Sequence, residues 1–369
     1  MRVFLLVGAC LLLVVGLALW FLDWGRSSLP GTDMSHLHAS AVPGHIEHLK
    51  SRDASARTKA ATILWQMGVL AKEATPTLLQ VAKDPDPQVR EVAVKALGRT
   101  GQGTQDAIPG LIEALEDDHA EVRAAAATSL AETWRLAPAG RSPASRLHPA
   151  DRRAEGRDTP TQGSPPTKLA PPYEALAQKA VPLLTGALRD TDARVRACAA
   201  EALAETGPLA EPAVPDLVHI LEKDADSSAR LQATLALYNI GPGARTAVPV
   251  LIEKLHREEA DGVRVNTAAA LGMIRSSPET VVPALVETFL KDKHPDARTC
   301  AMMSIGQFGP DAKLALPLLR EAAKDPKNQE SAATMEKINR LLGFLGKQAQ
   351  AGKDRAGEMP PPSQGPPSK

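Results

Sequence analysis

Hydrophobic positions recur along this chain in units of 33 or 34 residues. Each unit opens with a proline, and apolar side chains follow two, three and six places on, as Leu217, Val218 and Leu221 do after Pro215. These offsets lie on one face of a helix, and proline suits a first helical turn, where its missing N–H costs nothing. The prolines that open the units are Pro43, Pro76, Pro109, Pro182, Pro215, Pro249, Pro283 and Pro317.

A second helix is predicted in each unit by a recurring arginine. These are Arg57, Arg90, Arg123, Arg196, Arg230, Arg264 and Arg298. Ala stands three places after each of them, except for Thr267, and Leu or Ile stands seven places after. Asp53, Asp86, Asp192 and Asp226 lie four places before and suit an N-cap, while His119, Ala260 and His294 hold that place elsewhere. Gly-Pro pairs such as Gly207-Pro208 are typical helix stops.

The motifs Val-Pro-x-Leu and Val-Arg-x-x-Ala resemble the HEAT-repeat family, in particular the short HEAT-like repeats of phycobilisome lyases. The resemblance implies an all-α protein, a right-handed α-α superhelix (HEAT-like solenoid) of about eight helix pairs. Repeats 1–3 would occupy residues 42–136 and repeats 4–8 residues 173–346. The last unit has Ala332 in place of the arginine and several polar residues, as a terminal capping repeat needs.

Two segments interrupt or follow the repeats. The distance from Arg123 to Pro182 is 59 residues, where every other such distance is 19. The extra stretch, residues 137–172, is rich in Pro and Arg and has no apolar period, so we expect it to be disordered. It would be either a solubilising spacer or a flexible arm that reaches a bound partner. The Pro-rich tail, residues 347–369, is expected to be disordered as well.

The N-terminus predicts a membrane anchor. After the short flank of residues 1–2, residues 3–22 contain no charge and no proline, and a helix of that length matches a bilayer core of roughly 30 Å. A cleaved signal is the alternative, and Cys10 could also mark a lipoprotein processing site. Arg2 makes the N-terminal flank positive, which places the linker of residues 23–41 and the solenoid on the non-cytoplasmic side of a single-pass protein.

Composition narrows the function. Aromatic residues make up 3% of the chain, so the core must be built from Ala, Leu and Val. Lys plus Arg and Asp plus Glu number 43 each, and this balance argues against a nucleic-acid partner, since phosphate binding favours a basic excess. Three cysteines cannot make a disulfide framework, and Cys198 and Cys300 are expected to be core residues.

We expect no catalytic residues, no cofactor and no metal site. His45 and His48 share a helical face and could hold a transition metal, but a terminal helix also shows polar residues to water. The chain contains no His-Glu dipeptide, whereas the HEAT-like deoxyhypusine hydroxylases draw their iron ligands from such pairs. The arginine row is expected to form a structural ladder with Asp84, Asp117, Asp190 and Asp292, or else to be a stripe that binds an extended anionic partner.

The second helices line the concave side in arrays of this kind. Positions one, five and eight after the arginine are expected to face it, and they are apolar from Pro215 onward, with polar residues at the edges. The candidate partner-binding residues are Leu231, Gln232, Leu235, Tyr238, Asn239, Val265, Asn266 and Met303. The sequence thus predicts a non-catalytic, membrane-anchored scaffold that binds a protein or peptide partner. The alternatives are that these residues are core, or that the protein is an enzyme or enzyme accessory of the lyase type with a ligand or metal in the groove.

Overall fold

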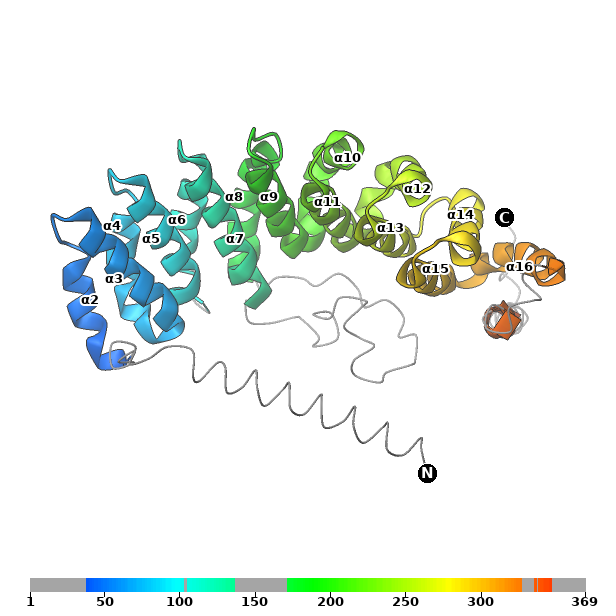
Figure 1. The fold of residues 1–369 in the computed structure, drawn as a ribbon, viewed down its shortest axis with the longest axis horizontal. Helices are drawn as coiled ribbons and strands as arrows, with labels where there is room; N and C mark the ends of the chain where they lie inside the picture. Colours follow the sequence, from blue (N-terminus) through cyan, green and yellow to red (C-terminus); the bar gives the residue numbers. More distant parts are fainter. Residues whose placement is uncertain (1–37, 103–104, 137–170, 327–334, 337, 347–369) are drawn as a thin grey trace, which may run out of the picture.

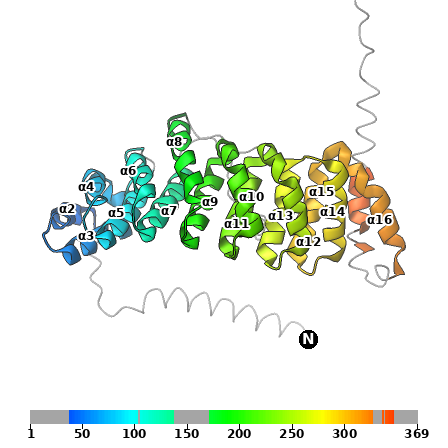
Figure 2. The ribbon, with the colours of Figure 1, turned by 90° about the horizontal axis from the view of Figure 1, so that it is seen from above.

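The computed structural model describes residues 38–102, 105–136, 171–326, 335–336 and 338–346. Helix pairs follow one another in a single row, which arches in one view and is nearly straight in the other (Figures 1 and 2). No strand occurs in these ranges, so the all-helical solenoid predicted from the repeats is confirmed. None of the helices within them has the length and apolar character needed to cross a bilayer. The predicted anchor, residues 3–22, lies outside them.

Each repeat contributes a first and a second helix. The first helices are α2 (Val42–His48), α4 (Thr75–Val81), α6 (Ile108–Glu113), α8 (Pro171–Ala187), α10 (Val214–Lys223), α12 (Val248–Arg257), α14 (Pro278–Lys291) and α16 (Ala315–Lys324). The second helices are α3 (Ala54–Met67), α5 (Pro87–Thr100), α7 (Ala120–Leu136), α9 (Ala193–Thr206), α11 (Ser227–Ile240), α13 (Asp261–Ile274) and α15 (Pro295–Gln307). Residues 335–336 and 338–346 are helical and follow α16.

Short 3-10 segments accompany these helices. They are η2 (Ala39–Ala41), η3 (Gly68–Ala74), η4 (Ala114–Glu116), η7 (Gly207–Ala213), η8 (Gly241–Ala247) and η9 (Gly309–Leu314). Gly68, Gly207, Gly241 and Gly309 open four of them with φ between 54° and 67°, a conformation that glycine adopts without strain. The predicted Gly-Pro helix stops are therefore confirmed.

The N-caps follow the sequence prediction. The Asp53 side chain accepts hydrogen bonds from the backbone N–H groups of Ser55 and Ala56, and Asp86, Asp192 and Asp226 cap their helices in the same way. His294 also caps, because its Nδ1 accepts from the backbone of Asp296. Ala260, at the start of α13, has no side chain that could do so.

Two first helices begin earlier than predicted. α8 starts at Pro171 and α14 at Pro278, so Pro182 and Pro283 lie inside helices and not in their first turns. At α14 the Gly-Pro stop is replaced by Arg275 and Ser277, both with φ of 52°, which turn the chain quickly enough for Pro278 to begin the next helix. The predicted disordered insertion, residues 137–172, thus ends two residues too late, and the rest of it lies outside the described residues, as does the tail.

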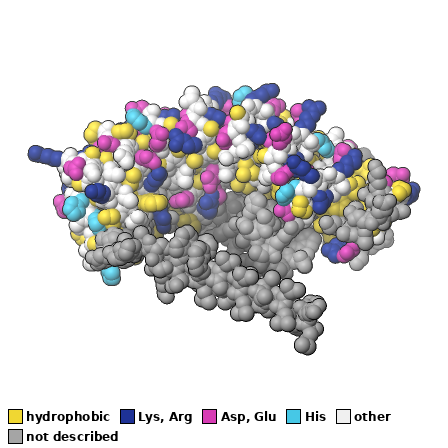
Figure 3. Space-filling view, in the orientation of Figure 1, with side chains coloured by type: hydrophobic (Ala, Val, Ile, Leu, Met, Phe, Trp, Pro, Cys, Tyr) yellow, Lys and Arg dark blue, Asp and Glu magenta, His cyan; other side chains and the backbone are white. Residues whose placement is uncertain are grey.

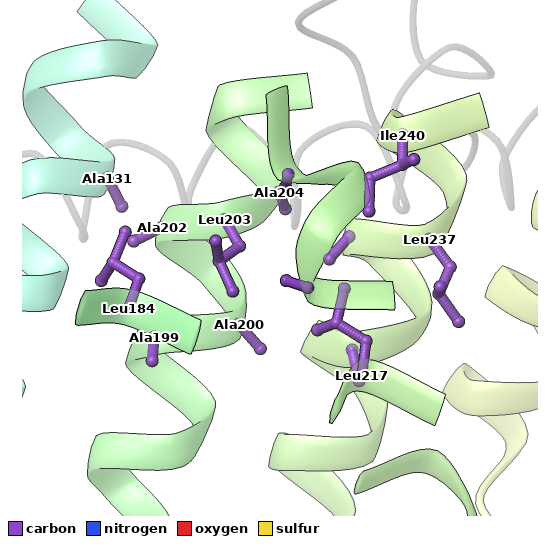
Figure 4. Packing of buried hydrophobic residues seen from close by; sticks show 14 of the residues in the cluster. Ala131, Leu184, Ala199, Ala200, Ala202, Leu203, Ala204, Leu217, Leu237 and Ile240 are labelled. Atoms are coloured by element: carbon purple, nitrogen blue, oxygen red, sulfur yellow. The ribbon is translucent and has the colours of Figure 1, made fainter. Parts of the chain in front are cut away.

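Small and branched aliphatic side chains fill the core. The residue three places after each arginine, Ala in six repeats and Thr267 in the other, is buried, and so is the Leu or Ile seven places after, as Ala199 and Leu203 show in α9. Figure 4 shows this layer from Ala131 through Leu203 to Leu237, with alanines between the leucines. The alanines let neighbouring helices come close, while the leucines fill the spaces between them.

Candidate functional site

The second helices lie on the inner side of the arch. α11, α13 and α15 lie inside α10, α12 and α14 in Figure 1. Successive second helices also contact one another far more extensively than successive first helices do. Because neighbours on the inside of a curve are closer, the second helices form the concave face, as the sequence predicted.

Close approach between second helices depends on glycine at two places. A Cβ built on Gly272 would lie 2.6 Å from the Cβ of Ser304 on the next second helix, and Gly98 stands in the same relation to Ser129. Polar contacts join other neighbours: Thr128 donates to the thiol of Cys198, and Asn239 donates to the carbonyl oxygen of Ala204. The inner face is therefore a nearly continuous layer of packed helices.

An arginine ladder runs along the edge where each first helix turns into its second. In every rung, Nε and Nη2 of the arginine donate to both oxygens of a carboxylate in the next repeat, at 2.6–3.1 Å. Nη1 donates to two backbone carbonyl oxygens of its own repeat, for example those of Glu258 and Glu259 in the case of Arg264. The rungs are Arg57–Asp84, Arg90–Asp117, Arg123–Asp190, Arg196–Asp224, Arg230–Glu258 and Arg264–Asp292.

The predicted structural role of the arginine row is thus confirmed for these six rungs. Asp224 and Glu258 complete two rungs that the sequence analysis did not name. Each carboxylate also accepts from a backbone N–H two residues on, as Asp292 does from His294, so the ladder fixes the turn as well as the neighbouring repeat. Bidentate pairs of this kind are strong and directional.

The ladder lowers the pKa of its carboxylates. Hydrogen bonding from Arg196 lowers the pKa of Asp224 against the opposing effect of burial. Burial alone would raise the pKa of Asp292, but hydrogen bonds from Arg264 and from the backbone of His294 outweigh it, and the pKa is lowered. These acids are therefore charged and committed to structure, which leaves them poor candidates for proton transfer.

The predicted partner-binding residues fall into three groups by exposure. Met303 is 38% exposed, while Val265 and Asn266 are buried at 6% and 5%. The others are half-buried: Leu231, Gln232, Leu235, Tyr238 and Asn239. Of these, Leu231, Leu235 and Tyr238 pack against the core. Val265 and Asn266 belong with the core because every residue from 263 to 274 of α13 is buried. We call the half-buried and exposed apolar residues Leu231, Leu235, Tyr238 and Met303 the inner strip.

The inner face changes character along the array. On α5, the half-buried positions equivalent to Leu231 and Leu235 of the inner strip are Glu91 and Lys95, which form an ion pair. On α7, Arg135 binds Glu201 and Glu205 of α9 at 2.7 and 3.1 Å. The spacing of apolar positions, from which the candidate residues were predicted, gives no sign of these ion pairs. The inner strip thus lies C-terminal to these charged side chains.

Three further polar features lie near these helices. The Oε1 atoms of Gln232 and Gln307 are buried and accept no hydrogen bond. Arg99 lies over the ring of Trp65, with its Cζ 5.6 Å from the ring centroid. On the face seen in Figure 3, basic and acidic side chains are interspersed, so that face offers no extended surface of one sign.

His45 and His48, the weaker candidates for a metal site, lie close together, but no third ligand is grouped with them among the described residues. The ring centroids of His45 and His48 are 6.4 Å apart. Within the described ranges, three potential metal ligands come together only at Asp117, Asp118 and His119. Asp117 there already binds Arg90 as a ladder rung, so this cluster is explained by the ladder. Neither Cys198 nor Cys300 forms a disulfide with a described residue, and their side chains are half-buried and buried, respectively.

Comparison with known proteins agrees with this geometry. The family model for HEAT repeats matches residues 42–131, 169–238 and 248–336. No curated protein sequence matches the chain.

Solved structures share the fold at low identity. The Escherichia coli protein YibA is 17% identical, with 86% of this chain and 98% of that chain covered at a TM-score of 0.51. A chain from a structure of the interaction between cadherin and β-catenin is 14% identical, with coverages of 85% and 62% and a TM-score of 0.51. The CpcE–CpcF phycocyanin lyase of Nostoc sp. PCC7120 is 23% identical, with coverages of 53% and 98%, but its TM-score of 0.36 is too low to bear on function. The family model matches well over half of the chain, and the protein belongs to the HEAT-repeat family.

Proposed function

We propose that this protein is a non-catalytic scaffold, anchored in a membrane by residues 3–22, which binds a protein or peptide partner on the concave face of its solenoid. The observation that carries the proposal is the inner strip. Leu231, Leu235 and Tyr238 keep partial exposure on α11, and Met303 is exposed on α15. Apolar side chains with polar neighbours on a concave surface are typical of a protein-binding groove.

The architecture suits such a role. Contacts in a solenoid are made only between neighbouring repeats, so a long surface stays available along the inside of the array. Six of the seven arginines that could have formed an anionic-ligand stripe are used in the ladder.

The experiment is site-specific photo-crosslinking of the full chain in host membranes. A photoreactive amino acid is placed at Met303 on the inner strip and, as a matched control, at His256, which is exposed on the outer helix α12. We expect one crosslinked protein from position 303 and none from position 256. Leu235→Asp should abolish that product if the chain keeps the helical circular dichroism of the wild type. Equal crosslinking from both positions would contradict binding on the inner face.

The second candidate function is the lyase-type enzyme or accessory, with a ligand or metal in the groove. The proximity of His45 and His48 is the observation that favours a metal. Stoichiometric metal in the purified protein, lost on His45→Ala, would overturn the non-catalytic proposal and place a metal site in the first repeat.

A further inference from the structure

The two edges of the solenoid differ in what they expose. One edge carries the turns within repeats and the arginine ladder. The other, which we call the inter-repeat edge, carries the turns that join a second helix to the next first helix, including η3. In the first three repeats this edge is at the bottom of Figure 1, and the described chain begins there, at the N-terminal end of α2.

Exposed apolar side chains lie on this edge in the first and third repeats. Six large hydrophobic side chains are exposed among the described residues, and three of them lie here. Val69 and Leu70 in η3 are 53% and 57% exposed, and Leu136 at the end of α7 is 46% exposed. The other three, Met303, Leu318 and Phe344, belong to the C-terminal repeats.

The turn itself does not require these side chains. Gly68 has the same positive φ as Gly207, Gly241 and Gly309, so the four turns share their backbone conformation. In the later three, proline follows the glycine, and only η3 has Val69 at that place. Because the fold is satisfied by proline there, two consecutive exposed aliphatic residues point to a contact outside the array.

Helix lengths place these residues level with the start of the described chain. α3 has 14 residues, while η2 and α2 together have 10, so α3 is longer by only roughly 5 Å at 1.5–2.0 Å per residue. Val69 and Leu70, which follow α3, therefore lie near the point at which the chain enters the solenoid.

The residues that precede this point indicate which surface the inter-repeat edge would contact. Residues 3–22 are uncharged and long enough to span a bilayer, and fifteen residues, 23–37, separate them from His38. A flexible chain of that length has a root-mean-square span on the order of 20 Å, from roughly 5–6 Å times the square root of the residue number. A spanning helix at residues 3–22 would thus keep the inter-repeat edge close to the lipid.

We propose that the inter-repeat edge of repeats 1–3 lies on the membrane surface, with Val69, Leu70 and Leu136 in contact with the boundary between lipid headgroups and acyl chains. The proposal rests on the membrane anchor of the proposed function. Three aliphatic side chains would hold a free domain only weakly. The anchor makes the contact intramolecular, at an effective concentration that short linkers raise to the millimolar range.

The test uses the full chain added to vesicles of phosphatidylethanolamine and phosphatidylglycerol. Cys10, Cys198 and Cys300 are replaced by alanine, and a single new cysteine carries an NBD fluorophore at position 70 or, as the control, at Arg52, which is exposed on the opposite edge of the same repeat. Dithionite, which does not cross the bilayer, destroys NBD that is in water. We expect destruction about tenfold slower at position 70 than at position 52, the factor given by a tenfold preference for the membrane-bound state.

A second variant tests whether the native side chains of the edge, and not the NBD label, cause the membrane contact. With the probe at position 136, the double variant Val69→Asp and Leu70→Asp should show the fast dithionite rate of position 52, because two carboxylates would keep this edge away from the lipid. The variant should still fold, because both native side chains are exposed. Equal rates at positions 70 and 52, in protein that floats with the vesicles, would overturn the edge contact and leave the anchor standing. Protein that does not float would overturn both.

Discussion

Replacing Arg264 by Met removes the most buried rung of the ladder. Arg264 is 3% exposed and binds Asp292 at 2.9 and 3.1 Å, Asp261 at 2.6 Å and two carbonyl oxygens. Methionine fills similar space but leaves the Asp292 carboxylate, itself 7% exposed, without a counter-charge. Breaking one side of a buried ion pair costs about 3–5 kcal/mol. Asp292 keeps its hydrogen bond from His294, so we expect a loss near the lower end, about 3 kcal/mol.

The assay is urea unfolding followed by circular dichroism at 222 nm. Because this rung joins repeats 6 and 7, its loss should also weaken their coupling and split the transition into two. The matched control is Arg257→Met, which removes an ion pair with Glu253 that is 79% and 55% exposed and should cost less than about 1 kcal/mol. In Arg264→Met with Asp292→Asn, the loss should be smaller than the sum of the two single losses. A loss in Arg264→Met no larger than in the control would refute the view that the ladder holds the repeats together.

Three further outcomes are expected. Asp224 and Asp292 have pKa values below those of the unfolded chain, so the stability they contribute is present above the unfolded value of about 4 and disappears as the pH falls through their folded values; the urea midpoint should drop as the pH falls below about 4, and a constant midpoint would count against the ladder. Gly272→Ala should destabilise by about 1–3 kcal/mol because its Cβ would meet Ser304, whereas Gly343→Ala, on a helix with nothing within 4 Å, should stabilise by about 0.5–1 kcal/mol; thermal unfolding of both variants compares the signs. Ala260→Ser should give α13 its missing cap and raise stability by about 1 kcal/mol in the same urea assay, and an unchanged midpoint would show that the cap is not needed.

The fold was predictable from the sequence because the same spacing of capping and buried residues recurs in each repeat. Asp53 and Asp86 mark helix starts, and Ala199 and Leu203 mark buried layers, each by a spacing that local geometry explains. The exceptions arose where tertiary context overrode a local rule. Pro283 lies inside α14 because the preceding turn, at Arg275 and Ser277, is tighter than the usual Gly-Pro stop.

The candidate site was less predictable. Exposure on the inner face depends on how closely neighbouring repeats pack, which one repeat does not show. Val265 and Leu231 occupy equivalent places, yet Val265 is buried and Leu231 is half-exposed. The ion pair of Arg135 with Glu201 joins residues 66 apart, and the register that brings them together exists only once the array is stacked.

The rung between Arg123 and Asp190 has a consequence for folding. The other rungs join residues 27 or 28 apart, whereas this one joins residues 67 apart. Closing the longer loop costs about 0.8 kcal/mol more, from (3/2)RT times the logarithm of the length ratio. Growth of structure from repeat to repeat should therefore slow several-fold at this boundary, in either direction. Newly made protein would pass through a stage in which three repeats are folded and the next five are not, and a chaperone or protease would meet the chain at that boundary.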